Sequence, residues 1–175
     1  HLSLRRQRQM CIRDRRILNV NMTSEKVVEA AQFLKDFEPK DVLVVSARQY
    51  GWKPAKKFAD ACGFTCSSGR FTPGRLTNPE MRFFIEPKII VLTDPAADAQ
   101  AFREALNINV PVIAMCDSNN LTTDIDIVVP GNNKGRRSLA LIYWLMAREI
   151  LRIKGELPAD GELEETIDDF EAPLI

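Results

Sequence analysis

Short apolar runs alternate along this chain with segments in which apolar residues recur every three or four positions. The runs are typical of strands that are buried on both faces, and the recurring pattern is typical of amphipathic helices. We therefore expect strands at 41–46, 88–94, 110–116 and 125–129, with shorter ones at 17–21 and near Phe64. Helices are expected over 23–37, 53–62, 99–106 and 136–154.

The alternation of these elements predicts the fold class. Buried strands that alternate with helices form a parallel sheet covered by helices on both faces, which makes this an α/β protein. In such sheets ligands bind at the carboxyl ends of the strands. The loops to search for function are therefore 46–52, 69–78, 94–98, 117–123 and 130–137.

The last of these loops has the composition of an anion-binding site. Residues 130–138 read Pro-Gly-Asn-Asn-Lys-Gly-Arg-Arg-Ser and lead directly into an apolar helix. Backbone N–H groups, side-chain amides and fixed positive charge together bind phosphate. The glycine spacing matches neither the P-loop nor the dinucleotide-binding fingerprint, so the loop indicates phosphate without indicating a nucleotide.

Cations and amides gather in three of the loops, with aromatic rings among them. The candidate nucleic-acid-binding residues are Arg48, Tyr50, Lys53, Lys56, Lys57, Arg70, Phe71, Arg75, Thr77, Asn78, Asn132, Asn133, Lys134, Arg136 and Arg137. The cations would neutralise phosphates, and the amides would bind phosphate or ribose hydroxyl groups. Tyr50 and Phe71 would either stack on bases or close the edge of the core.

Charge is segregated along the chain although Lys plus Arg and Asp plus Glu both number 24. Residues 155–175 hold eight of the acidic residues and no basic residue. A basic body favours an anionic partner. We expect 156–175 to be a flexible acidic tail, because its carboxylates repel one another and few apolar groups oppose them.

The inventory of catalytic groups is small. The one histidine is His1, and there is no Gly-x-Ser-x-Gly sequence. Cys116 ends a predicted strand but has no histidine to activate it. Asp94 and Asp117 also end strands, where they would either hold Mg²⁺ or cap the following turns, and we favour capping. We expect no enzyme activity and no cofactor.

The cysteines do not predict a metal site. Cys62 and Cys66 are spaced for a zinc knuckle, but the chain lacks a second pair of ligands. The longest apolar run, 139–147, is far shorter than the roughly 20 residues that span a bilayer. We expect a cytoplasmic protein with no membrane partner.

Four motifs resemble one known family. They are GRFTPGRLTNP at 69–79, EPKIIVLTDP at 86–95, NVPVIAMCD at 109–117 and DIVVPGNNKGRRS at 126–138. They resemble the small-subunit ribosomal protein two family, in the archaeal and eukaryotic branch that includes the laminin-receptor precursor. The resemblance implies a three-layer, flavodoxin-like (Rossmann-like) fold and a structural role in the small ribosomal subunit. Its expected partners are small-subunit rRNA and neighbouring ribosomal proteins.

Some positions depart from the family pattern. Ala96 and Ala99 stand where the family has Arg and His, Gly131 stands where it has Cys, and Arg75 stands where it has Thr. Residues 1–16 do not resemble the family and look like translated adapter sequence, so we expect them to be an artefact. The expected domains are thus 17–155, the α/β domain, and 156–175, the acidic tail. The alternative function is a small-molecule phosphate- or nucleotide-binding domain that uses the same loops.

Overall fold

A computed structural model describes residues 18–158, 161, 163 and 165–174 of the chain. Its centre is a five-stranded sheet in which every neighbouring pair of strands is parallel, in the order β2-β1-β3-β4-β5. The strands are β1 (Val42–Ser46), β2 (Thr65–Ser68), β3 (Ile89–Leu92), β4 (Val112–Cys116) and β5 (Ile127–Pro130). The helices are α2 (Val20–Leu34), the 3-10 turn η1 (Pro39–Asp41), α3 (Gln49–Cys62), α4 (Ala99–Asn107), α5 (Arg136–Lys154) and α6 (Ile167–Phe170). The predicted parallel α/β fold is confirmed, and its strand order is that of flavodoxin-like sheets.

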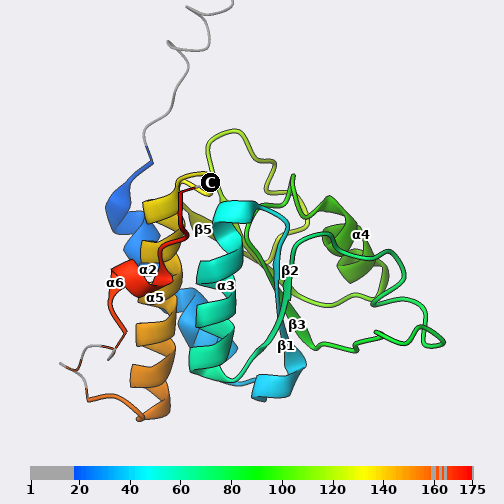
Figure 1. Ribbon diagram of the computed structural model, residues 1–175, viewed down its shortest axis with the longest axis horizontal. Helices are drawn as coiled ribbons and strands as arrows, with labels where there is room; N and C mark the ends of the chain where they lie inside the picture. Colours follow the sequence, from blue (N-terminus) through cyan, green and yellow to red (C-terminus); the bar gives the residue numbers. More distant parts are fainter. Residues whose placement is uncertain (1–17, 159–160, 162, 164, 175) are drawn as a thin grey trace, which may run out of the picture.

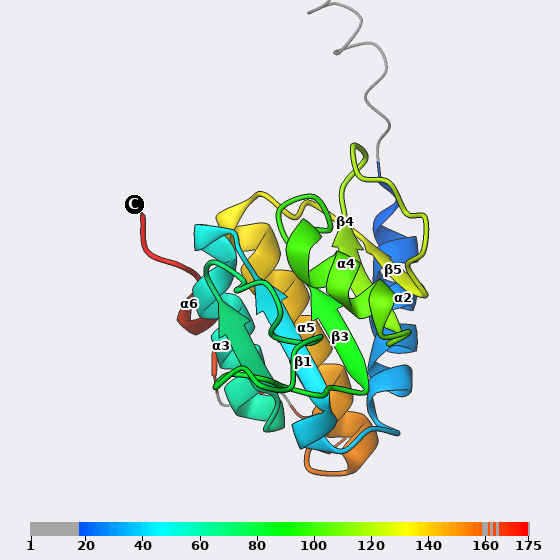
Figure 2. The ribbon, with the colours of Figure 1, turned by 90° about the vertical axis from the view of Figure 1, so that its right-hand side faces the viewer.

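The sheet lies between two unequal layers (Figure 1). Helices α2, α3 and α5 cover one face and enclose the larger core. The other face is covered by α4 and by the loop at residues 69–88, which enclose the smaller core (Figure 2). Along β1, Val42 and Val44 belong to the larger core, whereas Leu43 and Val45 belong to the smaller one. This alternation explains why the strands read as unbroken apolar runs.

The element boundaries differ from expectation at several places, and helix α2 ends at Leu34 instead of residue 37. The short strand expected at 17–21 is wrong within the described residues, because the side chain of Asn19 accepts a hydrogen bond from Asn21 N and Val20 begins α2. Helix α3 begins at Gln49 instead of residue 53, so Pro54 lies inside the helix. Pro54 is the sixth residue of α3, past the first turn, so the helix forms without the hydrogen bond that a backbone N–H at this position would donate to Tyr50 O. Helix α5 has the predicted bounds.

The expectation for residues 1–16 falls outside the described part of the chain. Among the described residues, no helix is both long and apolar enough to cross a bilayer.

Candidate nucleic-acid interface

The carboxyl ends of the strands meet at one edge of the sheet, which we call the carboxyl edge (Figure 2). There the loops that follow β1, β3, β4 and β5 are joined by a network of polar side chains. The buried carboxylate of Asp94 pairs with Arg48, whose Nε lies 2.6 Å away, and it also accepts from Asn120 Nδ2 at 2.8 Å. Arg48 is therefore committed to an internal ion pair, and the network fixes the loops relative to one another.

The two asparagines of the 131–135 loop have different positions. Asn133 is fully buried, and its Nδ2 donates to Met115 O and to Asn120 Oδ1, each at 3.0 Å. Asn132 is exposed, and its Oδ1 accepts from the backbone N–H groups of Lys134 and Gly135, each at 3.0 Å. Because a buried amide cannot reach a ligand outside, the RNA contact expected of Asn133 is corrected to a structural role.

Lys134 lies at the surface of this loop. Its Nζ is 3.0 Å from Asn119 Oδ1 and 3.3 Å from Asp117 Oδ2, and the side chain is still 45 % exposed. An exposed ion pair of this kind contributes little free energy, so the cation stays available to an external phosphate.

Gly131 is the glycine that stands where the family has cysteine. A Cβ at this position would lie 2.7 Å from Ile142 Cδ1, the end of a flexible side chain in the larger core. Glycine at 131 therefore leaves room for this rotamer of Ile142.

The carboxylates of Asp94 and Asp117 accept hydrogen bonds from nearby backbone N–H groups at this edge. Asp94 Oδ1 accepts from Ala96 N at 3.0 Å, and Asp117 Oδ1 accepts from Ser118 N at 2.7 Å. The Asp94 contact, to the N–H two residues further on, is the kind of turn contact that we favoured over metal binding, whereas the Asp117 contact reaches only the next residue. Within the described ranges, no group of three or more His, Cys, Asp or Glu side chains is placed to hold a metal ion. Burial raises the pKa of the Cys116 thiol to about 11, which disfavours a thiolate there.

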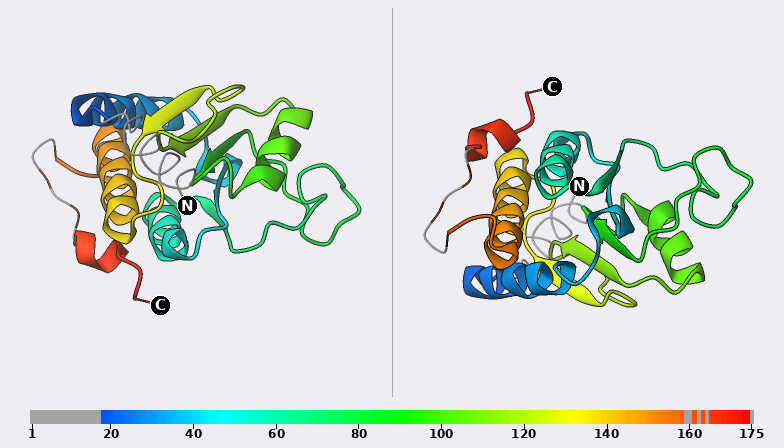
Figure 3. Two further views of the ribbon diagram at one scale, coloured as in Figure 1. Left: turned by 90° about the horizontal axis from the view of Figure 1, so that it is seen from above. Right: turned by 90° about the horizontal axis from the view of Figure 1, so that it is seen from below.

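The loop at 69–88 extends away from the body of the sheet (Figure 3). Arg70, Thr77 and Asn78 are exposed on it. Phe71 is only 6 % exposed and belongs to the smaller core. Stacking on a base requires an open ring face, so Phe71 closes the core and is not a stacking residue. Arg75 is half-buried, donating from NH1 to Ser67 Oγ at 2.7 Å.

The same loop carries an exposed ring that the sequence analysis missed. Phe83 is 62 % exposed, and the guanidinium carbon of Arg82 lies 5.8 Å from its ring centroid. The neighbouring Phe84 is half-buried. The available signal was the Arg-Phe-Phe sequence. Its rings lie at a turn closed by the hydrogen bond from Phe84 N to Met81 O at 3.0 Å, which leaves the ring of Phe83 outside.

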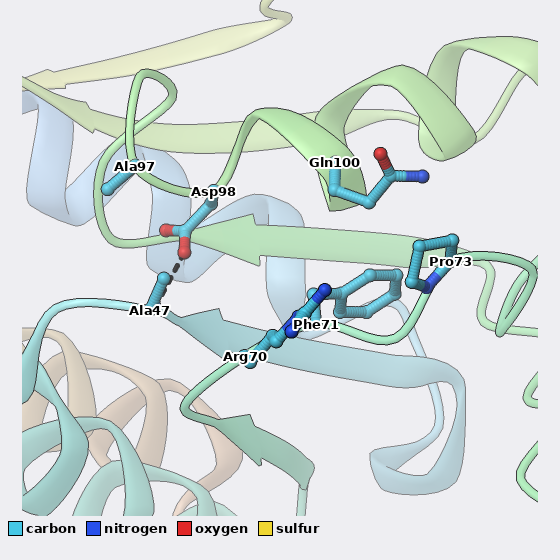
Figure 4. A pocket seen from close by; sticks show the side chains of 7 residues that line it. All are labelled: Ala47, Arg70, Phe71, Pro73, Ala97, Asp98 and Gln100. Atoms are coloured by element: carbon cyan, nitrogen blue, oxygen red, sulfur yellow. Dashed lines mark hydrogen bonds between the residues drawn. The ribbon is translucent and has the colours of Figure 1, made fainter.

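A hollow of about 430 Å³ opens between the segments that follow β1, β2 and β3, where the strand order reverses (Figure 4). Its lining includes Arg70, Phe71 and Asp98. The Asp98 carboxylate accepts from Ala47 N at 2.6 Å and from Asp94 N at 3.0 Å. Burial nevertheless raises the pKa of Asp98 to about 6. Asp98 thus occupies two backbone N–H groups at this wall, and Arg70 is the one cation among the described lining residues.

The remaining candidates lie on α3 and at the start of α5. Tyr50 is half-buried and packs against the larger core, and Lys56 is exposed. Lys53, Lys57, Arg136 and Arg137 face the acidic segment at residues 165–171. The side chain of Phe170 in that segment is fully buried in the larger core. This differs from the flexible tail that charge repulsion predicted, because apolar burial and ion pairs offset the repulsion.

Comparison with known proteins agrees with the motifs. Residues 80–152 match the family described as Ribosomal protein S2. The small ribosomal subunit protein uS2 of Thermoplasma acidophilum is 52% identical over 158 residues, which cover 90% of this chain and 79% of that protein. The protein of the same name from Haloquadratum walsbyi is 51% identical over 158 residues, covering 90% of this chain and 55% of that protein. The similarity therefore extends well beyond the residues that the family profile matches.

Proposed function

Because this chain belongs to the ribosomal protein S2 family, in its archaeal and eukaryotic-type branch, we propose that it is a structural component of the small ribosomal subunit. In this role it binds rRNA and neighbouring ribosomal proteins, and it carries out no catalysis. Its place in the cell is then the small ribosomal subunit. For the domains, we propose that residues 17–155 form the α/β domain and that 156–175 is an acidic extension.

The observation that supports RNA binding is the exposure of cations and amides on the carboxyl edge and the 69–88 loop. The proposed contact residues on this surface are Arg70, Thr77, Asn78, Asn132 and Lys134, together with Arg82 and Phe83. Lys56, exposed on α3, is proposed as a further contact outside this surface. Such a surface binds a phosphate backbone through several modest, salt-dependent contacts and reads the shape of RNA more than its sequence. Phe83 adds one platform on which an unpaired base can stack.

Internal hydrogen bonds preorganise the proposed interface in the absence of RNA. The Asp94 network fixes the carboxyl edge, and the buried carboxylate of Glu104 on α4 accepts hydrogen bonds from Gly74 N and Leu76 N in the 69–88 loop. A preformed surface loses less conformational entropy on binding than a flexible one.

The test is charge reversal at two exposed cations, Arg70→Glu together with Lys134→Glu. The measurement is co-sedimentation of the full chain with small subunits, or binding to small-subunit rRNA, across a salt series. Removing about two phosphate contacts should lower the slope of log K against log[salt] by about two.

The matched control is Lys40→Glu, an exposed cation in η1 at the opposite end of β1. It should leave the salt slope unchanged. The proposal is overturned when Lys40→Glu weakens binding as much as the double variant does, or when the unmodified chain does not bind small subunits.

A further inference from the structure

Four of the cations that the sequence offered to RNA contact one acidic segment of the chain itself, three of them through ion pairs and Lys53 through a backbone oxygen. They are Lys53 and Lys57 on α3 and Arg136 and Arg137 in the first turn of α5, and we call them the α3/α5 basic patch. Residues 165–171, the acidic strap, lie against this patch, and α6 within the strap packs on α5 and α3. In Figure 3 the strap lies at the start of α5, far from the 69–88 loop. Arg136 and Arg137 follow Lys134 closely in the chain, so the patch adjoins the carboxyl edge and extends the interface proposed above away from that loop.

The contacts are those of an anion on a cationic surface. Glu171 Oε1 lies 2.5 Å from an NH2 group of Arg136, close enough for an ion pair but without the alignment of a hydrogen bond. Glu171 Oε2 lies 3.6 Å from Arg137 Nε, and the backbone oxygen of Glu171 accepts from Lys53 Nζ at 2.9 Å. A single acidic residue thus contacts three cations of the patch.

Two further carboxylates continue the strap along the patch. Glu165 Oε1 accepts from Lys57 Nζ at 2.5 Å, and this hydrogen bond raises the pKa of Lys57. Asp168 Oδ1 lies 4.0 Å from Arg137 NH2, and both side chains are about 80 % exposed. Negative groups therefore follow one another along the patch, as phosphates do along a nucleic-acid strand.

The start of α5 carries excess positive charge, which a nearby negative group would stabilise. The first turn of α5 contains two arginines and no acidic residue, although the partial positive charge of a helix N-terminus already disfavours cations. Glu171, whose side chain is only 12 % exposed, supplies the missing negative charge. A phosphate oxygen placed there would serve the same electrostatic purpose.

The strap is anchored by groups other than its charges. Phe170 is fully buried, and Trp144 Nε1 donates to the backbone oxygen of Glu165 at 2.9 Å. Thr166 and Asp169 form a capping box at the start of α6. The carboxylates of Glu165 and Asp168 lie at the surface, so the charges on the strap can be removed while its apolar anchor is kept.

We propose that the acidic strap is an internal mimic of a phosphate backbone and that it covers a second polyanion-binding surface, the α3/α5 basic patch. The partner that fits this surface is a strand of RNA, held through its phosphates. The inference rests on the proposed function of RNA binding. While the strap is charged, the patch contributes little to RNA affinity; once the strap is neutral, the patch binds RNA in addition to the carboxyl edge.

The experiment uses the full chain with Glu165→Gln, Asp168→Asn and Glu171→Gln, which leaves Phe170 in place. The probe is a 20-nucleotide oligouridylate, titrated at several salt concentrations. The neutral-strap variant should bind at least tenfold more tightly at low salt, with a salt slope steeper by two to three, because new phosphate contacts form. The fluorescence of Trp144 reports whether the strap stays docked, and the gain is expected in either case because both states uncover the cations.

Two controls make the result specific. Glu25→Gln, Glu29→Gln and Asp36→Asn remove the same charge from exposed positions on and beside α2, and these changes should not steepen the salt slope. Adding Arg136→Gln and Arg137→Gln to the neutral-strap variant should abolish most of the gain.

The outcomes separate this inference from the proposed function. The inference is overturned if the neutral-strap variant gains no affinity for oligouridylate, or if the gain persists after the two arginines are replaced. In both cases, salt-dependent binding by the unmodified chain still supports the proposed function. A neutral-strap variant that binds polyglutamate and not oligouridylate overturns the inference as well, because the patch would then fit an acidic protein segment.

Discussion

Replacing Glu104 with Ala tests whether a single buried carboxylate orders the loop that carries the proposed RNA contacts. Glu104 lies on α4 and is 4 % exposed. Its carboxylate accepts from Gly74 N at 2.7 Å and from Leu76 N at 3.0 Å, both in the 69–88 loop. Gln100 Nε2, from the preceding turn of α4, also donates to Glu104 Oε1 at 2.8 Å.

The expected magnitude follows from the two backbone donors. A hydrogen bond to a charged acceptor is worth about 1.5–3 kcal/mol. Gly74 is half-buried and can be rehydrated when Glu104 is removed, whereas Leu76 is 3 % exposed and its N–H is left without an acceptor. We therefore expect the free energy of local loop opening to fall by about 3 kcal/mol, which corresponds to roughly a hundredfold in the opening equilibrium.

The assay is hydrogen exchange at the backbone amide of Leu76, followed by NMR or mass spectrometry. In Glu104→Ala this amide should exchange about a hundredfold faster, while amides in β1 and β3 keep their protection because the strand ladders remain intact. RNA binding should weaken in the same variant, because Arg70 and Phe83 are then no longer held in place.

The control is Gln100→Ala, which removes the side-chain donor to Glu104 and leaves both backbone bonds intact. Its effect on Leu76 exchange should be under threefold. If Glu104→Ala also leaves Leu76 exchange within threefold of the unmodified chain, the carboxylate does not hold the loop and the reasoning is refuted.

Three further predictions concern other parts of the site. Phe83→Ala should weaken binding to single-stranded RNA by roughly fivefold to a hundredfold without changing the salt slope, since stacking is worth about 1–3 kcal/mol and carries no charge; a changed slope in a salt titration would contradict stacking. Because burial raises the pKa of Asp98 to about 6, its contribution to the free energy of unfolding is greatest below its unfolded pKa and falls by about 3 kcal/mol as pH rises through 6. Urea denaturation at pH 4 and pH 7 should therefore show this difference between the unmodified chain and Asp98→Asn, and a difference independent of pH would count against it. Asn133→Ala should lower the unfolding free energy by about 2 kcal/mol, because Met115 O loses its buried donor; an unchanged urea midpoint would show that the network is dispensable.

The sequence alone determined the fold class and most of the elements. Apolar runs such as Val42–Ser46 and Val112–Cys116 can be buried on both faces only in a parallel sheet between two layers, and the period of 136–154 suits only a helix. The same pattern located the carboxyl edge, because parallel strands all end there. The pattern of apolar residues wrongly predicted a strand at 18–21, because the Asn19 side chain caps the start of α2 there.

The tertiary structure alone decided which candidate residues are free to bind. Phe71 and Asn133 each lie in a polar loop of the sequence, yet both are buried in the structure, whereas Phe83 is left exposed. Composition separated a basic body from an acidic tail, but it did not show that Glu171 folds back onto Lys53 and Arg136. The physical reason is that secondary structure follows from nearest neighbours along the chain, whereas the pairing of charges depends on segments brought together over more than a hundred residues.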